Sequence, residues 1–311
     1  MVKGPVAHRK KEVHRGDWLF AQFIQAGAML LIALLLALAW FLIKGGWPAI
    51  ERYGARFLFS SNWNPVLEVF GAAPVIYGTL VSSAIAIMIA APLSVSVALF
   101  LHAVAPPKIR AVFSFFVDML AAIPSVVYGL WGIFVLAPWL RSDVEPWLSE
   151  HFGFLPFFQG PFYGVGMLAA GLILAIMIIP SIFAMCSEVF RSLPVTYKEA
   201  ALALGATRWE MMQIAFLRAG KRGIIGGIIL GLGRALGETM AVTMLIGNRD
   251  EISVSLFSPG QTMASVIANE YAEAGSSIHV AALIEVGLVL FCMTILVNAL
   301  ARIIIRSDDA I

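Results

Sequence analysis

The hydrophobic residues of this chain fall into six long runs that are separated by short polar stretches. A bilayer core about 30 Å thick requires roughly 20 apolar residues in a helix, and each run meets that length. Lipid offers no hydrogen-bond partners, so the backbone of each run must satisfy its own polar groups as a helix. The pattern therefore predicts an all-α membrane protein with six transmembrane helices, at Phe20–Ile43, Pro74–Leu101, Ala111–Pro138, Phe162–Phe190, Gly223–Gly247 and Ile278–Ile305.

The composition agrees with this pattern, because 60% of the residues are hydrophobic and only 13% are charged. Soluble domains carry about a quarter charged residues. Cys186 and Cys292 both lie inside predicted spans, and the five histidines are scattered along the chain. Neither a disulfide framework nor a metal site is predicted, and we expect no cofactor.

Basic residues concentrate on one side of the predicted spans. They precede the first span, lie between spans two and three and between spans four and five, and follow the last, whereas the opposite loops are mainly acidic. By the positive-inside rule, both termini are expected in the cytoplasm. A basic N-terminus can also recruit nucleic acid, but beside an apolar span we favour the topology signal and expect no nucleic-acid partner. The first run is longer than the core of a signal peptide, so a membrane anchor is favoured over a cleaved leader.

The predicted organisation has three parts: residues 1–73 with the cytoplasmic N-terminus, the first span and an outward loop; residues 74–305 with the other five spans; and a cytoplasmic tail at 306–311. The outward loop at 44–73 is rich in tryptophan and turn residues. It is either a folded loop at the headgroup level or a docking surface for an external partner.

The cytoplasmic segment at 191–222, between spans four and five, is predicted to contain two short helices. Thr196 is placed as an N-cap, and Glu199 three residues later would complete a capping box. Ala200 and Ala201 favour a helix and allow a partner to approach closely, and Gly205 permits a turn before the second helix.

The fifth predicted span contains a stripe of small residues and two charges. Gly223, Gly227 and Gly231 recur every four residues, so we expect them to pack against a neighbouring helix. Arg234 lies about 18 Å along the helix from the cytoplasmic end of the span, near the middle of the membrane. Glu238 is four residues further on, where it would share a face with Arg234 and neutralise it.

A charge in the membrane is costly, so this pair is either a structural ion pair or part of an anion path. We favour the path, because a guanidinium stays charged and offers a planar fork of donors that matches phosphate oxygens. Asp118 and Glu285 also lie inside predicted spans, and the sequence does not distinguish a path role from pairing with a neighbouring helix.

Residues 199–205 resemble the EAA motif of binding-protein-dependent ABC importer permeases, although the Leu-Pro that usually ends the motif is missing. Residues 231–242, which read GLGRALGETMAV, are similar to the signature of PstC-type phosphate ABC transporter permeases, and segments 120–132, 176–180, 268–274 and 279–283 match the same family. The resemblance implies a type I ABC importer permease (MetI-like) fold in the bacterial inner membrane. It also implies that Glu199, Ala200, Ala201 and Gly205 form a coupling helix, and that Arg234 and Glu238 act in phosphate passage.

The resemblance further implies three partners: a second permease of the PstA type, a dimeric ATP-binding subunit, and a periplasmic or surface phosphate-binding protein. The chain contains no Gly-x4-Gly-Lys-Ser/Thr loop, so we expect ATP hydrolysis in the partner and no enzyme activity here. Another oxyanion such as sulfate or molybdate stays open as the cargo. A secondary anion transporter and a membrane-bound regulatory scaffold are the alternatives from other classes.

Overall fold

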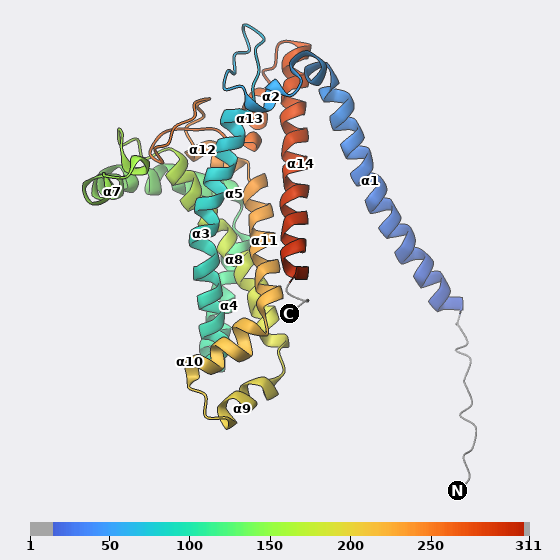
Figure 1. The fold of residues 1–311 in the computed structure, drawn as a ribbon, viewed down its shortest axis with the longest axis vertical. Coiled ribbons are helices and arrows are strands. Elements are labelled where there is room, and N and C mark those ends of the chain that lie inside the picture. The colour runs from blue at the N-terminus through green and yellow to red at the C-terminus, as the bar shows by residue number, and fades with distance from the viewer. Residues whose placement is uncertain (1–14, 308–311) are drawn as a thin grey trace. The chain divides into compact units, whose positions relative to one another are not determined.

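The computed structural model describes residues 15–307, and these residues form helices joined by loops (Figure 1). Within this range no strand forms, and β-type pairing is limited to two isolated bridges, Asn64 with Val69 and Gly247 with Gly260. The prediction of an all-α membrane protein is confirmed. The basic N-terminal residues 1–14 and the end of the tail at 308–311 lie outside the described residues.

The chain divides into two units, residues 1–44 and 45–311, and the first helix crosses the division. The longer helices are α1 (Arg15–Tyr53), α3 (Ala73–Ala103), α4 (Pro107–Ala122), α8 (Met167–Ser192), α11 (Lys221–Gly237) and α14 (Ser277–Ser307). The shorter helices are α2 (Arg56–Phe59), α5 (Ser125–Trp131), α6 (Ala137–Trp139), α7 (Glu145–Phe152), α9 (Val195–Ala203), α10 (Arg208–Met211), α12 (Met240–Leu245) and α13 (Met263–Glu270). Segments of π-helix at 132–136 and 140–144 join α5, α6 and α7, another at 212–218 follows α10, and one 3-10 turn lies at 156–158.

Four helices in the described range are long and apolar enough to cross a membrane by themselves: α1, α3, α8 and α14. They correspond to predicted spans one, two, four and six. α1 continues ten residues beyond the predicted end of its span, because glycines allow close packing on α14. A Cβ atom at Gly45 would lie 3.0 Å from the Ile284 side chain, and one at Gly46 would lie 3.4 Å from the backbone of Glu285.

Predicted spans three and five are broken, so the expectation of continuous helices there was wrong. α4 and the helical segment that begins with α5 meet at an angle of 92°. Pro124 favours a break here, since proline disfavours helical geometry in the preceding residue, and Ile123 has a ψ of 127°. Counting this bent pair as one span gives five crossings. In the fifth predicted span, α11 ends at Gly237, and Glu238 is extended before the short α12 begins.

The core of residues 45–311 is a bundle in which α3 and α8 form the most extensive pair and α11 packs on both. Figure 1 shows α9 and α10 at one end of this bundle, and α2 and α13 at the opposite end. Phe190 at the end of α8 packs edge-to-face on Phe216, with ring centroids 5.6 Å apart. This contact joins the α9–α10 segment to the bundle.

Candidate functional site

The segment between α8 and α11 folds as two short helices around a tight turn, as the sequence predicted. Gly205 lies in this turn with a φ of +83°, and a Cβ atom there would meet nothing within 4 Å. The left-handed backbone, rather than lack of space, is therefore the reason for glycine at this position. The turn reverses the chain between α9 and α10.

The capping of these helices differs from the prediction. α9 begins directly after Pro194 and has no side-chain cap, so Thr196 and Glu199 lie inside the helix. The capping box instead precedes α10, where Thr207 has the extended backbone that an N-cap requires and bonds reciprocally with Glu210. The hydrogen bonds donated by Thr207 hold the pKa of the Glu210 carboxyl below its usual value.

An apolar surface surrounds the turn. Leu204 is 90% exposed at its tip, and Val195, Tyr197 and Trp209 are also exposed. Glu199 and Ala200 face outward, whereas Ala201 is buried in the chain's own packing and its carbonyl accepts the Ala206 amide at 3.1 Å. Ala201 therefore supports the turn from inside, and the predicted close approach of a partner falls to Ala200. We call Val195, Tyr197, Leu204 and Trp209 the coupling surface.

The glycines of α11 divide between two faces. The structure places Gly223, Gly227 and Gly231 against α8, where Cβ atoms would lie 2.2 Å from Val189, 3.1 Å from Met185 and 2.6 Å from Ile182. Gly226, Gly233 and Gly237 point about a quarter turn away from that side, where a Cβ atom would meet nothing within 4 Å. One face of α11 is thus closely packed, and the other is open in this chain.

We expect Gly231→Val to destabilise the protein by about 1–3 kcal/mol, because the new side chain must displace Ile182 in a closely packed interface. The matched control is Gly233→Val, which makes the same change of helix propensity where a Cβ atom would meet no other atom of the described chain within 4 Å. Melting temperatures of this chain alone, solubilised in detergent, measure the difference. Equal melting temperatures for the two variants would show that the α8–α11 contact adds nothing to stability.

Arg234 lies in the last turn of α11, and its side chain is exposed. One of its terminal nitrogens donates to the Ser181 hydroxyl of α8 at 3.1 Å. The predicted neutralisation by Glu238 is not seen: in the part of the chain that the structure describes, no ion pair joins these two residues. The i,i+4 relation fails because the helix ends at Gly237, which leaves Glu238 in the extended break.

The breaks in the third and fifth spans lie in segments that pack on each other. Gly129 of α5 faces Ala241 and Met244 of α12, and a Cβ atom at Gly129 would lie 2.5 Å from the Met244 sulfur. Tyr128 of α5 lies within electrostatic range of Arg234. At membrane depth, non-helical backbone is tolerated only inside protein or along a water-filled path. The two breaks and Arg234 therefore mark the part of the chain best suited to line such a path.

At the other end of the bundle, one carboxylate joins three elements. Glu270, at the end of α13, accepts a hydrogen bond from the Trp63 indole at 2.9 Å and lies 2.9 Å from Nε2 of His279 in α14. Burial, with a smaller effect of Glu270, raises the pKa of the nearby Asp250 to about 6. These contacts hold loop 61–69 against α13 and α14.

The structure gives different environments to Asp118 and Glu285, the two other carboxyl groups whose roles the sequence did not decide. Asp118 is exposed on α4, a helix that buries none of its residues. Glu285 of α14 is buried, and its Oε2 atom has no hydrogen-bond partner. Ser181 and Tyr128 are the neighbours of Arg234 that sequence reasoning missed. The available signals were a polar residue after the helix proline Pro180 and the tyrosine that follows the Pro124 break.

Residues 90–307 match the family described as the binding-protein-dependent transport system inner membrane component. The match covers more than half of the chain. This chain belongs to that family.

Curated members of this transport family resemble the chain over nearly their whole length. The phosphate transport system permease protein PstC of Mesorhizobium japonicum is 44% identical over 298 residues, which are 94% of this chain and 91% of the relative. The PstC protein of Pasteurella multocida is 45% identical over 300 residues, 95% of this chain and 93% of its own. A probable PstC protein of Methanocaldococcus jannaschii is 39% identical over 257 residues, 81% of each chain.

Solved structures agree on the fold of the family. The inward-facing MetNI methionine ABC transporter aligns with a TM-score of 0.57 at 15% identity, covering 79% of this chain and 99% of the other. A bacterial alginate ABC transporter aligns with a TM-score of 0.57 at 17% identity, covering 91% and 97%. These two likenesses support the type I importer fold that the sequence resemblance implied.

Proposed function

We propose that this chain is a permease subunit of an ATP-binding-cassette importer that moves inorganic phosphate across the bacterial plasma membrane, the cell inner membrane. The observation that carries the proposal is Arg234, a permanently charged side chain exposed beside two helix breaks. Guanidinium suits phosphate oxygens, and among the described residues a single hydrogen bond, to Ser181, engages the Arg234 side chain. Relatives named as phosphate permeases, 44–45% identical, support the cargo.

The proposed orientation places both termini and the coupling loop at 191–222 in the cytoplasm, with residues 74–305 as the permease domain. A separate, dimeric ATP-binding subunit docks on the coupling surface. An exposed apolar group such as Leu204 and Trp209 is typical of a protein interface. Closure of the ATPase then moves α9 and α10, and the Phe190–Phe216 contact passes the movement to α8.

Two further partners are proposed, a second permease and a phosphate-binding protein. A second permease of the PstA type is proposed to cover the open face of α11, with Arg234 and Glu238 lining the path between the two subunits. A phosphate-binding protein is proposed to dock at the end that carries Glu270, where the loops are fixed by hydrogen bonds. This chain itself binds no cofactor and hydrolyses no ATP in the proposal.

The test is uptake of labelled phosphate into proteoliposomes that contain this chain with its partner permease, ATPase and binding protein. We expect uptake that requires ATP and persists when sulfate and molybdate are added in excess. Uptake that proceeds without ATP under an ion gradient would overturn the ABC assignment. Uptake that sulfate or molybdate blocks would overturn the cargo.

A further inference from the structure

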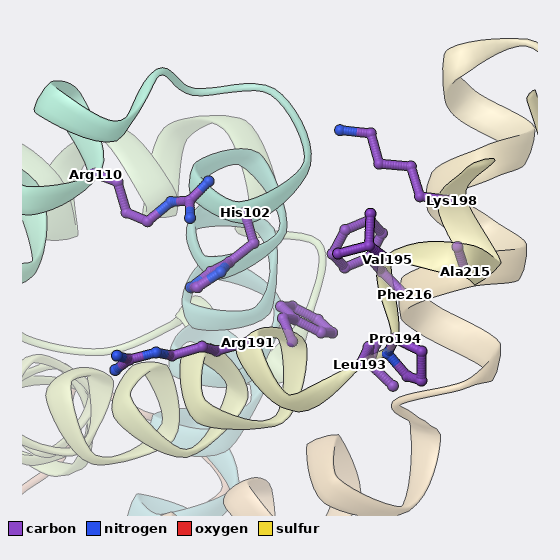
Figure 2. A pocket seen from close by; sticks show the side chains of 10 residues that line it. His102, Arg110, Arg191, Leu193, Pro194, Val195, Lys198, Ala215 and Phe216 are labelled. Carbon is purple, nitrogen blue, oxygen red and sulfur yellow. The ribbon is translucent and has the colours of Figure 1, made fainter.

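A cavity of about 220 Å³ lies at the end of the bundle that carries the coupling surface. Figure 2 shows it between the end of α3, the start of α4, the end of α8 and the start of α9. At about 30 Å³ for each water molecule, the cavity has ample room for a tetrahedral oxyanion. No residue that lines this cavity belongs to α11, the helix that carries Arg234. The cavity is therefore not part of the proposed path.

The polar side chains that line this cavity are all basic. They are His102 of α3, Arg110 of α4, Arg191 of α8 and Lys198 of α9. In Figure 2 the ends of Arg110 and Lys198 extend toward each other from opposite sides, whereas the Arg191 side chain extends on the Arg110 side, away from Lys198. These four side chains come from four different helices and from almost a hundred residues of sequence, and the fold brings them to one cavity.

These charges are poorly compensated within the described residues. Glu188 is the acidic group within electrostatic range of His102, where Arg110 and Arg191 also act. No ion pair joins Arg110, Arg191 or Lys198 to a carboxylate in the part of the chain that the structure describes. The lining thus carries three permanent cations and no carboxylate, with Glu188 acting on His102 and Glu199 next to Lys198 in the sequence.

Two further features prepare the cavity for an anion. The Nε atom of Arg110 donates to the Leu101 carbonyl at 2.8 Å, which holds the guanidinium in place and leaves its terminal nitrogens for a ligand. The nine-residue helix α9 begins beside the cavity at Pro194 and Val195, and no side chain caps it. The Tyr197 amide donates to the Pro194 carbonyl at 3.1 Å, so the amides of Val195 and Thr196 are the donors that this helix start adds beside the cavity, together with a favourable dipole.

We propose that this cavity is a binding site for a phosphate group, held by Arg110, Arg191 and Lys198. The ligand is either the headgroup of an anionic phospholipid or free phosphate, because both present the same oxygens to the guanidinium groups. Basic pockets between membrane helices on the cytoplasmic side are suited to anionic headgroups. The inference uses the proposed orientation of the chain but does not depend on its cargo.

The site links the ligand to the moving part of the chain. Lys198 belongs to α9 and precedes Glu199, whereas Arg110 and Arg191 belong to helices of the bundle. A bound phosphate group connects α9 to the ends of α4 and α8, so it stabilises one position of α9 relative to the bundle. Occupancy of the cavity is therefore expected to alter coupling without contributing to the path.

The experiment measures melting temperatures of the complete, detergent-solubilised transport complex. Phosphatidylglycerol is compared with phosphatidylcholine of the same acyl chains, and inorganic phosphate with chloride at equal ionic strength. We expect phosphatidylglycerol, phosphate or both to raise the melting temperature by about 2–4 °C. A response to phosphatidylglycerol alone that the cavity variants weaken identifies a lipid site, and a response to phosphate that they weaken identifies a site for the free anion.

The variants Arg191→Gln and Lys198→Gln are chosen because neither side chain makes a hydrogen bond within the described structure, so folding should survive. Each is expected to raise the half-saturating ligand concentration about tenfold. The control is Lys108→Gln, an exposed base in the first turn of α4 that does not line the cavity.

The proposal is overturned if neither ligand raises the melting temperature, or if all three variants respond as the parent does. The second outcome would place phosphate elsewhere, for example at Arg234, or leave the cavity to an acidic side chain of the ATPase. Because the assay measures binding rather than uptake, its failure leaves the proposed function intact.

Discussion

Replacing Arg234 with alanine is expected to lower ATP-driven phosphate uptake about a hundredfold or more in proteoliposomes. A hydrogen bond to a charged group contributes about 1.5–3 kcal/mol, and a guanidinium can donate two at once to a phosphate group. Beyond its first turn, α11 carries no other basic residue, so no neighbour on that helix can replace the lost charge. Initial rates of labelled phosphate uptake measure the effect.

Two controls separate loss of the path from loss of the fold. Arg234→Lys keeps the charge but not the planar fork, so an intermediate rate is expected. Arg302→Ala removes an exposed arginine near the end of α14, and uptake should not change. If Arg234→Ala imports phosphate at the parent rate while the complex assembles normally, phosphate does not pass this residue.

A second large loss of ATP-driven uptake is expected when the turn between α9 and α10 is altered. Gly205 has a φ of +83°, a conformation that costs a residue with a side chain about 1–2 kcal/mol and a β-branched residue more. Gly205→Val is therefore expected to reorient the coupling surface and to reduce ATP-driven uptake at least about tenfold. Uptake and ATPase activity are measured on the same preparations.

Gly205→Asn is the matched control, because asparagine tolerates left-handed backbone better than other residues with a side chain. No atoms of the described chain lie within 4 Å of the added Cβ, so within this chain the two variants differ mainly in backbone strain. We expect the asparagine variant to retain most of its uptake. Parent-like coupling in Gly205→Val would mean that the geometry of this turn does not matter to the ATPase.

Most of the membrane-spanning helices could be predicted from the sequence, because lipid imposes a simple requirement on the backbone. A run of about 20 apolar residues must become a helix in a bilayer, whatever packs beside it. Predicted spans one, two, four and six accordingly correspond to α1, α3, α8 and α14. The turn at Gly205 was also readable, since few residues other than glycine adopt its backbone.

The helix breaks in predicted spans three and five could not be predicted from the sequence in the same way. Pro124 and Pro180 are both helix prolines in apolar runs, yet the chain bends by 92° next to Pro124 while α8 continues through Pro180. A proline only removes one hydrogen bond and crowds the previous turn; packing decides whether the helix bends. Contacts of α5 with α12 are available at the first site, whereas α8 lies in the centre of the bundle.

The sequence by itself determined the fold class, the sites of close helix packing and the residue types suited to an anion path. Each of these follows from local composition and periodicity. Only the tertiary structure decided which charges meet. It separated Arg234 from Glu238 by ending α11 at Gly237, and it gathered Arg110, Arg191 and Lys198 around one cavity. The reason is physical: contacts between residues far apart in the chain depend on how helices end and cross, which no local pattern specifies.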